Sequence, residues 1–100
     1  MKKFDRNVKI SLLEELEHSI FEFEERISRE ESYYQILIYK DSLIDTLITS
    51  ANSLEEIDQW EFEMQVLKAQ IKQSQQELLF LKEDLNKQRR LYEVVKKDIC

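Results

Sequence analysis

The side chains best suited to metal or acid–base chemistry in this sequence are Glu15 and His18. Ferritin-like di-iron proteins use this Glu-x-x-His spacing to place two ligands on one face of a helix. Such a site needs a second copy of the motif and inward-facing carboxylates, whereas this chain has one histidine. The heptad pattern described below puts His18 at the outermost position of its helix. We therefore expect a solvated histidine, with neither a metal nor another cofactor.

The remaining reactive side chains do not indicate nucleophilic catalysis. The single cysteine, Cys100, is the last residue, so an intramolecular disulfide is impossible. A catalytic nucleophile also needs a structural element that presents it to a substrate, and no strand–turn element is predicted. The chain has no glycine, which rules out a glycine-rich phosphate-binding loop. The sequence predicts a protein that is not an enzyme.

The formal net charge of −6 disfavours nucleic acid as a partner, because phosphate binding needs a basic surface. A basic cluster does occur near the C-terminus, where Glu93 and Asp98 dilute it. Pairing with an acidic first helix explains this cluster better than nucleic-acid binding does. Its members are Lys87, Arg89, Arg90, Lys96 and Lys97.

The composition indicates long helices in a single domain of 100 residues. There is neither glycine nor proline, 36% of the residues are charged and 42% are apolar. Turns with positive φ and rigid corners therefore lack their usual residues, whereas an uninterrupted helix needs neither of them. Apolar runs such as 36–39 are too short to span a bilayer, and no apolar stretch follows the basic start. We expect a soluble, cytoplasmic protein.

A first heptad tract runs over residues 11–51, after a short basic N-terminal tail at 1–10. Ser11 and Glu14 have the spacing of a capping box, which predicts that the helix begins there. Apolar residues recur with the alternating spacing that keeps one seam of a helix facing a partner helix. The seam residues assigned to this tract are Leu13, Leu16, Ile20, Phe23, Ile27, Leu37 and Ile44.

A second tract over residues 54–99 follows the same pattern more regularly. Its seam residues are Ile57, Trp60, Met64, Leu67, Ile71, Leu78, Leu81, Leu85, Tyr92 and Val95. Four polar residues also occupy seam positions, either as groups that set the register or as points where the seam opens to water. They are Glu30 and Asp41 in the first tract, and Ser74 and Gln88 in the second.

The two tracts are out of phase by two residues, a shift that coiled coils do not absorb by local winding. The break lies at residues 50–53, where Asn52 is the best candidate for a left-handed residue that ends a helix. Ser53 and Glu56 form a second capping box. The sequence thus predicts an all-α fold in which two long helices form an antiparallel coiled-coil hairpin, with its turn at 52–53.

The charges beside the seam agree with this orientation. Folding the chain back about residue 52 brings Glu17 near Arg89, and Glu24 near Lys82. Such pairs select an orientation more than they add stability. The pattern also allows two alternatives, a continuous helix that forms a parallel homodimer and an antiparallel dimer of long helices.

Apolar residues outside the seam predict that the hairpin does not stay alone, because one seam buries little surface. We interpret them as a partner-binding surface near the turn, covered by a second protomer in a helical bundle or by another protein. They are Ile36, Tyr39, Leu43, Leu47, Phe62, Val66 and Ala69. The predicted function is a coiled-coil scaffold or adaptor that forms a homo-oligomer, a dimer or a tetramer, and also binds another protein. The alternative is a small acidic inhibitor or export chaperone that masks a partner protein's surface.

Overall fold

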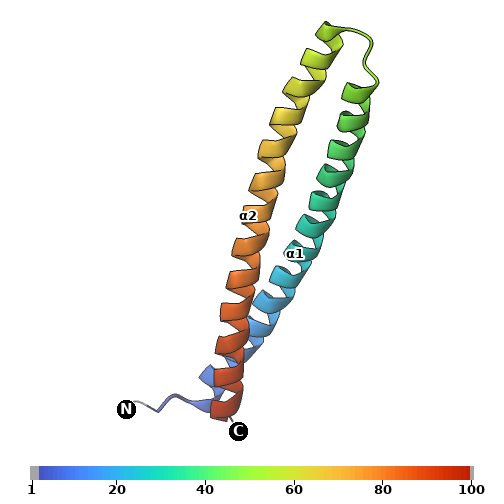
Figure 1. The fold of residues 1–100 in the computed structure, drawn as a ribbon. Coiled ribbons are helices and arrows are strands. Elements are labelled where there is room, and N and C mark those ends of the chain that lie inside the picture. Colours follow the sequence, from blue (N-terminus) through green and yellow to red (C-terminus); the bar gives the residue numbers. More distant parts are fainter. Residues whose placement is uncertain (1–2, 100) are drawn as a thin grey trace. The chain divides into compact units, whose positions relative to one another are not determined.

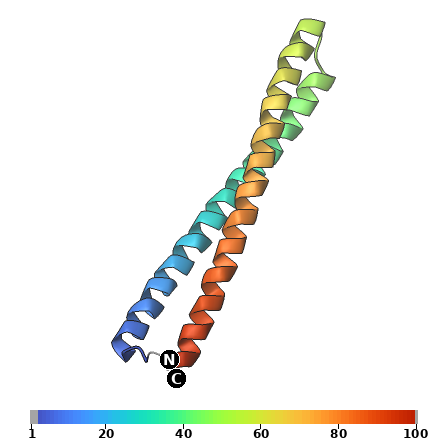
Figure 2. The ribbon, with the colours of Figure 1, turned by 90° about the vertical axis from the view of Figure 1, so that its left-hand side faces the viewer.

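The computed structural model describes residues 3–99 and contains two α-helices. α1 covers Arg6–Thr49 and α2 covers Leu54–Ile99, with 44 and 46 residues respectively. The described residues form no strand. The helices pack against each other as a helical hairpin, joined by the loop at 50–53 (Figure 1 and Figure 2). Cys100, the single cysteine of the chain, lies outside the described residues.

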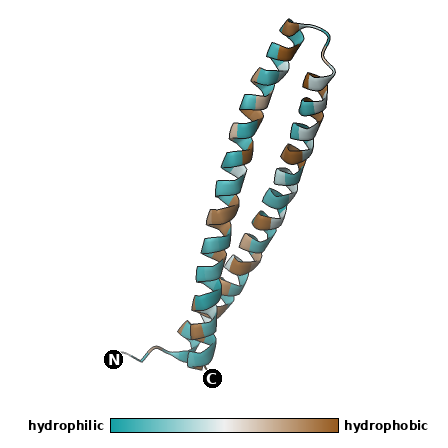
Figure 3. Ribbon diagram, in the orientation of Figure 1, coloured by the Kyte–Doolittle hydropathy of each residue, from teal (hydrophilic) through white to brown (hydrophobic). Residues whose placement is uncertain are grey.

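The hairpin divides into two compact units, each containing a segment of both helices. We call residues 29–78 the turn half, because they include the loop, and residues 1–28 with 79–100 the terminal half. Apolar residues recur at short intervals along both helices, separated by polar ones (Figure 3). This is the periodicity expected of helices that bury one stripe and leave the rest in water.

The first helix begins earlier than the sequence predicted. Asp5 caps it, since its carboxylate Oδ1 accepts a hydrogen bond of 3.3 Å from the backbone N–H of Asn7. The Asp5 carbonyl then accepts the first helical bond, from Lys9 at 3.2 Å. An aspartate suits this position because it pairs with a free N–H and places negative charge at the positive end of the helix dipole. The capping box at Ser11 is not used, and Ser11 lies inside α1.

The loop that ends α1 contains no left-handed residue. No described residue has a positive φ, so the left-handed conformation predicted for Asn52 is wrong. The hydroxyls of Thr46, Thr49 and Ser50 each donate to a carbonyl four residues earlier, at 3.1, 2.9 and 3.0 Å. Carbonyls in the last turn of a helix lack part of their usual backbone bonding. Two of these carbonyls are reached here without a left-handed residue: Ser50 Oγ also donates to the Leu47 carbonyl at 3.4 Å, and the Ala51 backbone N–H donates to the Ile48 carbonyl at 3.4 Å.

The second helix begins with the capping residue expected from the sequence. Ser53 Oγ accepts a hydrogen bond of 3.1 Å from the backbone N–H of Glu56. The Glu56 carboxylate reaches back to the N–H of Asn52 at 3.4 Å, one residue before the usual target in a capping box. Glu55 and Glu56 in the first turn, and Lys96 and Lys97 in the last, also complement the helix dipole.

Candidate protein interaction surface

The structure places every predicted seam residue on the buried side of the hairpin. All of them are buried or half-buried. In the turn half, Leu37, Ile44 and Leu67 form a core cluster, and Leu67 is only 1% exposed. The partly buried side chains that pack against this cluster are Ile48, Trp60, Met64 and Ile71. This apolar cluster holds the two helix segments of the turn half together, so their outward faces remain available for other contacts.

Polar seam residues in the turn half are bonded across the hairpin. Ser74 is 2% exposed and its hydroxyl donates to Glu30 Oε1 at 2.7 Å. Beside this pair, Gln75 Nε2 donates to the hydroxyl of Tyr34 at 3.2 Å. A buried polar pair of this kind penalises other registers, because a shifted register would leave both groups without a partner. The bond between Ser74 and Glu30 agrees with the first of the two interpretations, in which polar seam residues set the register.

Asp41 behaves differently from these pairs. Its Oδ1 atom is buried and has no hydrogen-bond partner among the described residues. A buried oxygen without a partner costs free energy, because folding removes its hydrogen bonds to water. Asp41 is therefore a point where the hairpin gives up stability.

Ion pairs and a polar bond link the two helices in the terminal half. Lys9 Nζ lies 2.9 Å from Asp98 Oδ2, and Arg89 Nη2 lies 3.5 Å from Glu24 Oε1. Glu17, which the sequence paired with Arg89, instead accepts a bond of 3.2 Å from the hydroxyl of Tyr92. The Arg89 guanidinium thus pairs with the carboxylate one heptad further along α1 than Glu17, the residue expected to lie near it.

The seven apolar residues predicted to bind a partner are all exposed and all lie in the turn half. The largest exposed fractions are those of Tyr39, Phe62 and Ile36, at 66, 64 and 63%. We call the set the turn patch, which consists of Ile36, Tyr39, Leu43, Leu47, Phe62, Val66 and Ala69. When the seven positions of each heptad are lettered a to g, the seam positions are a and d, and a falls at Leu13 in α1 and at Ile57 in α2. In an antiparallel pair the two g positions flank the same side of the seam, and the c positions extend that side. Four patch residues occupy such positions, and the other three lie on the outer f rows.

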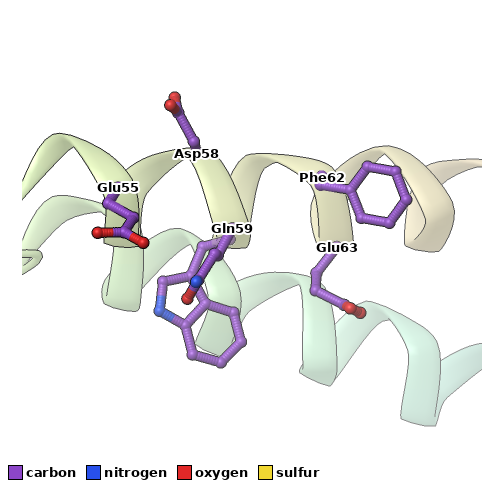
Figure 4. Close-up of a pocket in the computed structure, with 6 residues that line it drawn as sticks. Glu55, Asp58, Gln59, Phe62 and Glu63 are labelled. Carbon is purple, nitrogen blue, oxygen red and sulfur yellow. The ribbon is translucent and has the colours of Figure 1, made fainter.

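A shallow hollow in the surface of α2 adjoins the turn patch near the loop. It is lined by Glu55, Asp58, Gln59, Trp60, Phe62 and Glu63. The phenyl ring of Phe62 projects from the helix (Figure 4). Asp58 lies one turn earlier and Glu63 follows Phe62 directly, and their carboxylates point to different sides of α2. The hollow thus combines two aromatic side chains with several carboxylates.

The net charge of the chain resides in the turn half. The turn half has ten acidic and four basic residues, whereas the terminal half has eleven of each. No lysine or arginine occurs between Lys40 and Lys68, where the chain has seven acidic residues. The exposed apolar side chains of the turn patch therefore occur in a strongly acidic part of the chain.

The terminal half also exposes apolar side chains, which the sequence reasoning did not single out. Phe80 and Val94 occupy c positions of α2, and Leu91 occupies a g position. Each fits the helical spacing of a second stripe, which was the signal that could have found them. The large apolar side chains exposed in this half are Phe4, Val8, Leu12, Phe21, Leu79, Phe80, Leu91 and Val94.

The structure does not bring the candidate metal-ligating side chains into a common site among the described residues. His18 Nε2 lies 3.1 Å from Glu22 Oε1 on its own helix, with the His18 side chain 75% exposed. Among the described residues, no group of three or more His, Cys, Asp or Glu side chains is arranged to hold a metal ion. The basic cluster divides its contacts: Arg89 pairs with Glu24, while Lys96 Nζ lies 5.8 Å from the centre of the Tyr92 ring. These side chains contact their own hairpin.

No family model, curated protein or solved structure matches this chain. Within residues 3–99, neither helix is long and apolar enough to cross a membrane.

Proposed function

We propose that this protein is a coiled-coil interaction module that acts as a structural or adaptor subunit of a larger assembly. The observation that carries the proposal is the turn patch. It exposes seven apolar side chains on helices whose own seam is already filled by the core cluster. Exposed apolar surface of this kind is stabilised when another helix covers it. The covering helix comes from a second copy of the chain, which would give a dimer or tetramer, or from another protein.

The test is whether the turn patch drives association between helices. The chain is studied by sedimentation velocity, alone over a range of concentrations and with a synthetic amphipathic peptide of leucine and glutamine. We expect complexes larger than the monomer in at least one of these conditions. The double variant Leu43→Asp with Phe62→Asp should abolish them and keep the helix content measured by circular dichroism, because both side chains are exposed.

The matched control is the double variant Phe21→Asp with Phe80→Asp, which changes two exposed aromatic residues in the terminal half. It should leave the association unchanged. If the wild-type chain stays monomeric in every condition, or if both double variants behave alike, the turn patch is not an interaction surface.

A second candidate is a small acidic protein that masks a basic or amphipathic surface of another protein. The concentration of acidic residues in the turn half favours it. The two functions differ in the behaviour of the free protein. A scaffold forms an oligomer whose mass does not depend on concentration, whereas a masking protein is weakly associated or loosely packed alone and gains order with its target.

A further inference from the structure

The turn patch does not suit a second copy of itself. Between Lys40 and Lys68 the chain has seven acidic residues and no basic one. Packing two such surfaces together would bring like charges into contact, which opposes association. The terminal half has equal numbers of acidic and basic residues, so like-charge repulsion would not oppose its association with a second copy. The charge therefore points to a partner of opposite sign at the turn patch.

The carboxylates around Phe62 are free to meet such a partner. Glu55, Asp58, Glu61 and Glu63 are exposed, and none makes an ion pair within the described residues. In the terminal half, by contrast, carboxylates pair with basic residues of the other helix. Cations placed beside Phe62 would meet several unpaired carboxylates at once. Attraction of this kind raises the association rate and selects the partner.

The shape and spacing of the patch favour a helix. Ile36, Leu43 and Leu47 follow the 3.6-residue period along α1, over about 17 Å at 1.5 Å per residue. A partner helix of similar length can lay one apolar stripe along this row while its flanks face the carboxylates. We propose, resting on the function proposed above, that the turn half binds a basic amphipathic helix of another protein.

The single tryptophan of the chain provides a direct probe of this surface, because Trp60 lines the hollow beside Phe62. The full chain is titrated with a tryptophan-free synthetic peptide of about 18 residues, long enough for about 27 Å of helix. The peptide carries leucine at helical spacing and lysine on both flanks. We expect saturable binding with a blue shift of Trp60 emission, weakened by raising the ionic strength. A peptide with glutamate in place of each lysine should not bind.

Variants of the protein separate the apolar and electrostatic parts of the interaction. Phe62→Ser should weaken binding of the lysine peptide about tenfold, because exposed aromatic anchors carry much of the binding energy at helix-docking surfaces. Neutralising three carboxylates with Asp58→Asn, Glu61→Gln and Glu63→Gln should weaken it by a similar factor and reduce the salt dependence. The matched control removes the same charge from the terminal half with Glu14→Gln, Glu15→Gln and Glu25→Gln. This control should have little effect on the affinity for the lysine peptide or on its salt dependence.

The inference is overturned if the lysine and glutamate peptides bind equally, or if both triple variants lose the same affinity. It is also overturned if the chain oligomerises through the turn patch and the lysine peptide does not compete. In that case the occupant is a second copy, and the proposed interaction module still stands. If the chain neither self-associates nor binds any amphipathic peptide, both the inference and the proposed function fail.

Discussion

In the turn half, a continuous apolar cluster of Leu37, Ile44 and Leu67 joins the helices. In the terminal half, the buried apolar side chains are Leu16, Leu81 and Leu85, and ion pairs such as Lys9–Asp98 link the helix surfaces beside them. The two halves therefore share one heptad pattern but differ in what flanks it. The terminal half directs its charges across its own seam, whereas the turn half leaves carboxylates unpaired beside exposed apolar side chains. The seam therefore specifies the fold, whereas the flanks distinguish the half that we propose as the partner-binding one.

The largest expected effect tests whether the turn half is the better-packed part. Leu67→Ala removes the most buried side chain and should lower the free energy of unfolding by about 2–5 kcal/mol. The matched variant in the terminal half, Leu81→Ala, should cost less, because Leu81 is slightly more exposed than Leu67, at 4%, and does not belong to the core cluster. Urea unfolding followed by circular dichroism gives both values, and amide exchange shows which half opens. A larger loss for Leu81→Ala would reverse the comparison.

We expect an intermediate change in the free energy of unfolding at Asp41, whose buried oxygen lacks a hydrogen-bond partner in the turn half. Asp41→Leu replaces a buried oxygen that lacks a partner with an apolar side chain, and should raise the free energy of unfolding by about 1–3 kcal/mol. The control, Asp45→Leu, changes an exposed aspartate on the same helix and should alter stability by about 0.5 kcal/mol or less. Urea midpoints measured at low protein concentration separate this effect from association. Destabilisation by Asp41→Leu would show that its carboxylate has a stabilising partner.

The smallest effect concerns the ion pairs of the terminal half. Arg89→Gln removes the contact with Glu24, in which both side chains are about half exposed at 53 and 51%. Exposed pairs contribute about 0.2–1 kcal/mol, and salt screens them further. The loss of stability should therefore be small at low ionic strength and vanish at high ionic strength. A loss that persists in high salt would mean that the aliphatic part of Arg89 packs against the hairpin, and that charge does not account for its contribution.

The helical hairpin and the position of its loop could be predicted from the sequence, because seam periodicity and a two-residue phase shift depend only on the order of apolar residues. Two predictions about the helix ends were wrong, because several nearby groups can form the hydrogen bonds that end a helix. Asp5 and Ser11 can both cap a helix, and only the folded chain shows which one does. Asn52 is not left-handed, and the Leu47 and Ile48 carbonyls at the end of α1 accept instead from Ser50 Oγ and the Ala51 backbone N–H.

The candidate surface could be predicted in part. The seven residues of the turn patch stood out because they form a second stripe outside the seam, and the structure exposes them. The exposed residues Phe80 and Val94 were missed, since charged neighbours separate them in the sequence and hide the stripe. The partner of Arg89 was also missed, because a flexible guanidinium can reach either of two carboxylates one heptad apart.

The loop at 50–53 has backbone geometry that any residue can adopt, so the connection between the helices does not depend on a residue such as glycine. Ala51 has no side-chain hydrogen-bonding group, and the hydroxyls that finish α1 precede it. Extra residues inserted after Ala51 would enlarge the closed loop, and doubling a flexible loop costs only about 0.6 kcal/mol. A fluorescent label or a flexible linker can therefore be built into this position while the seam keeps its register, which makes the loop a natural attachment point for following the two helices separately.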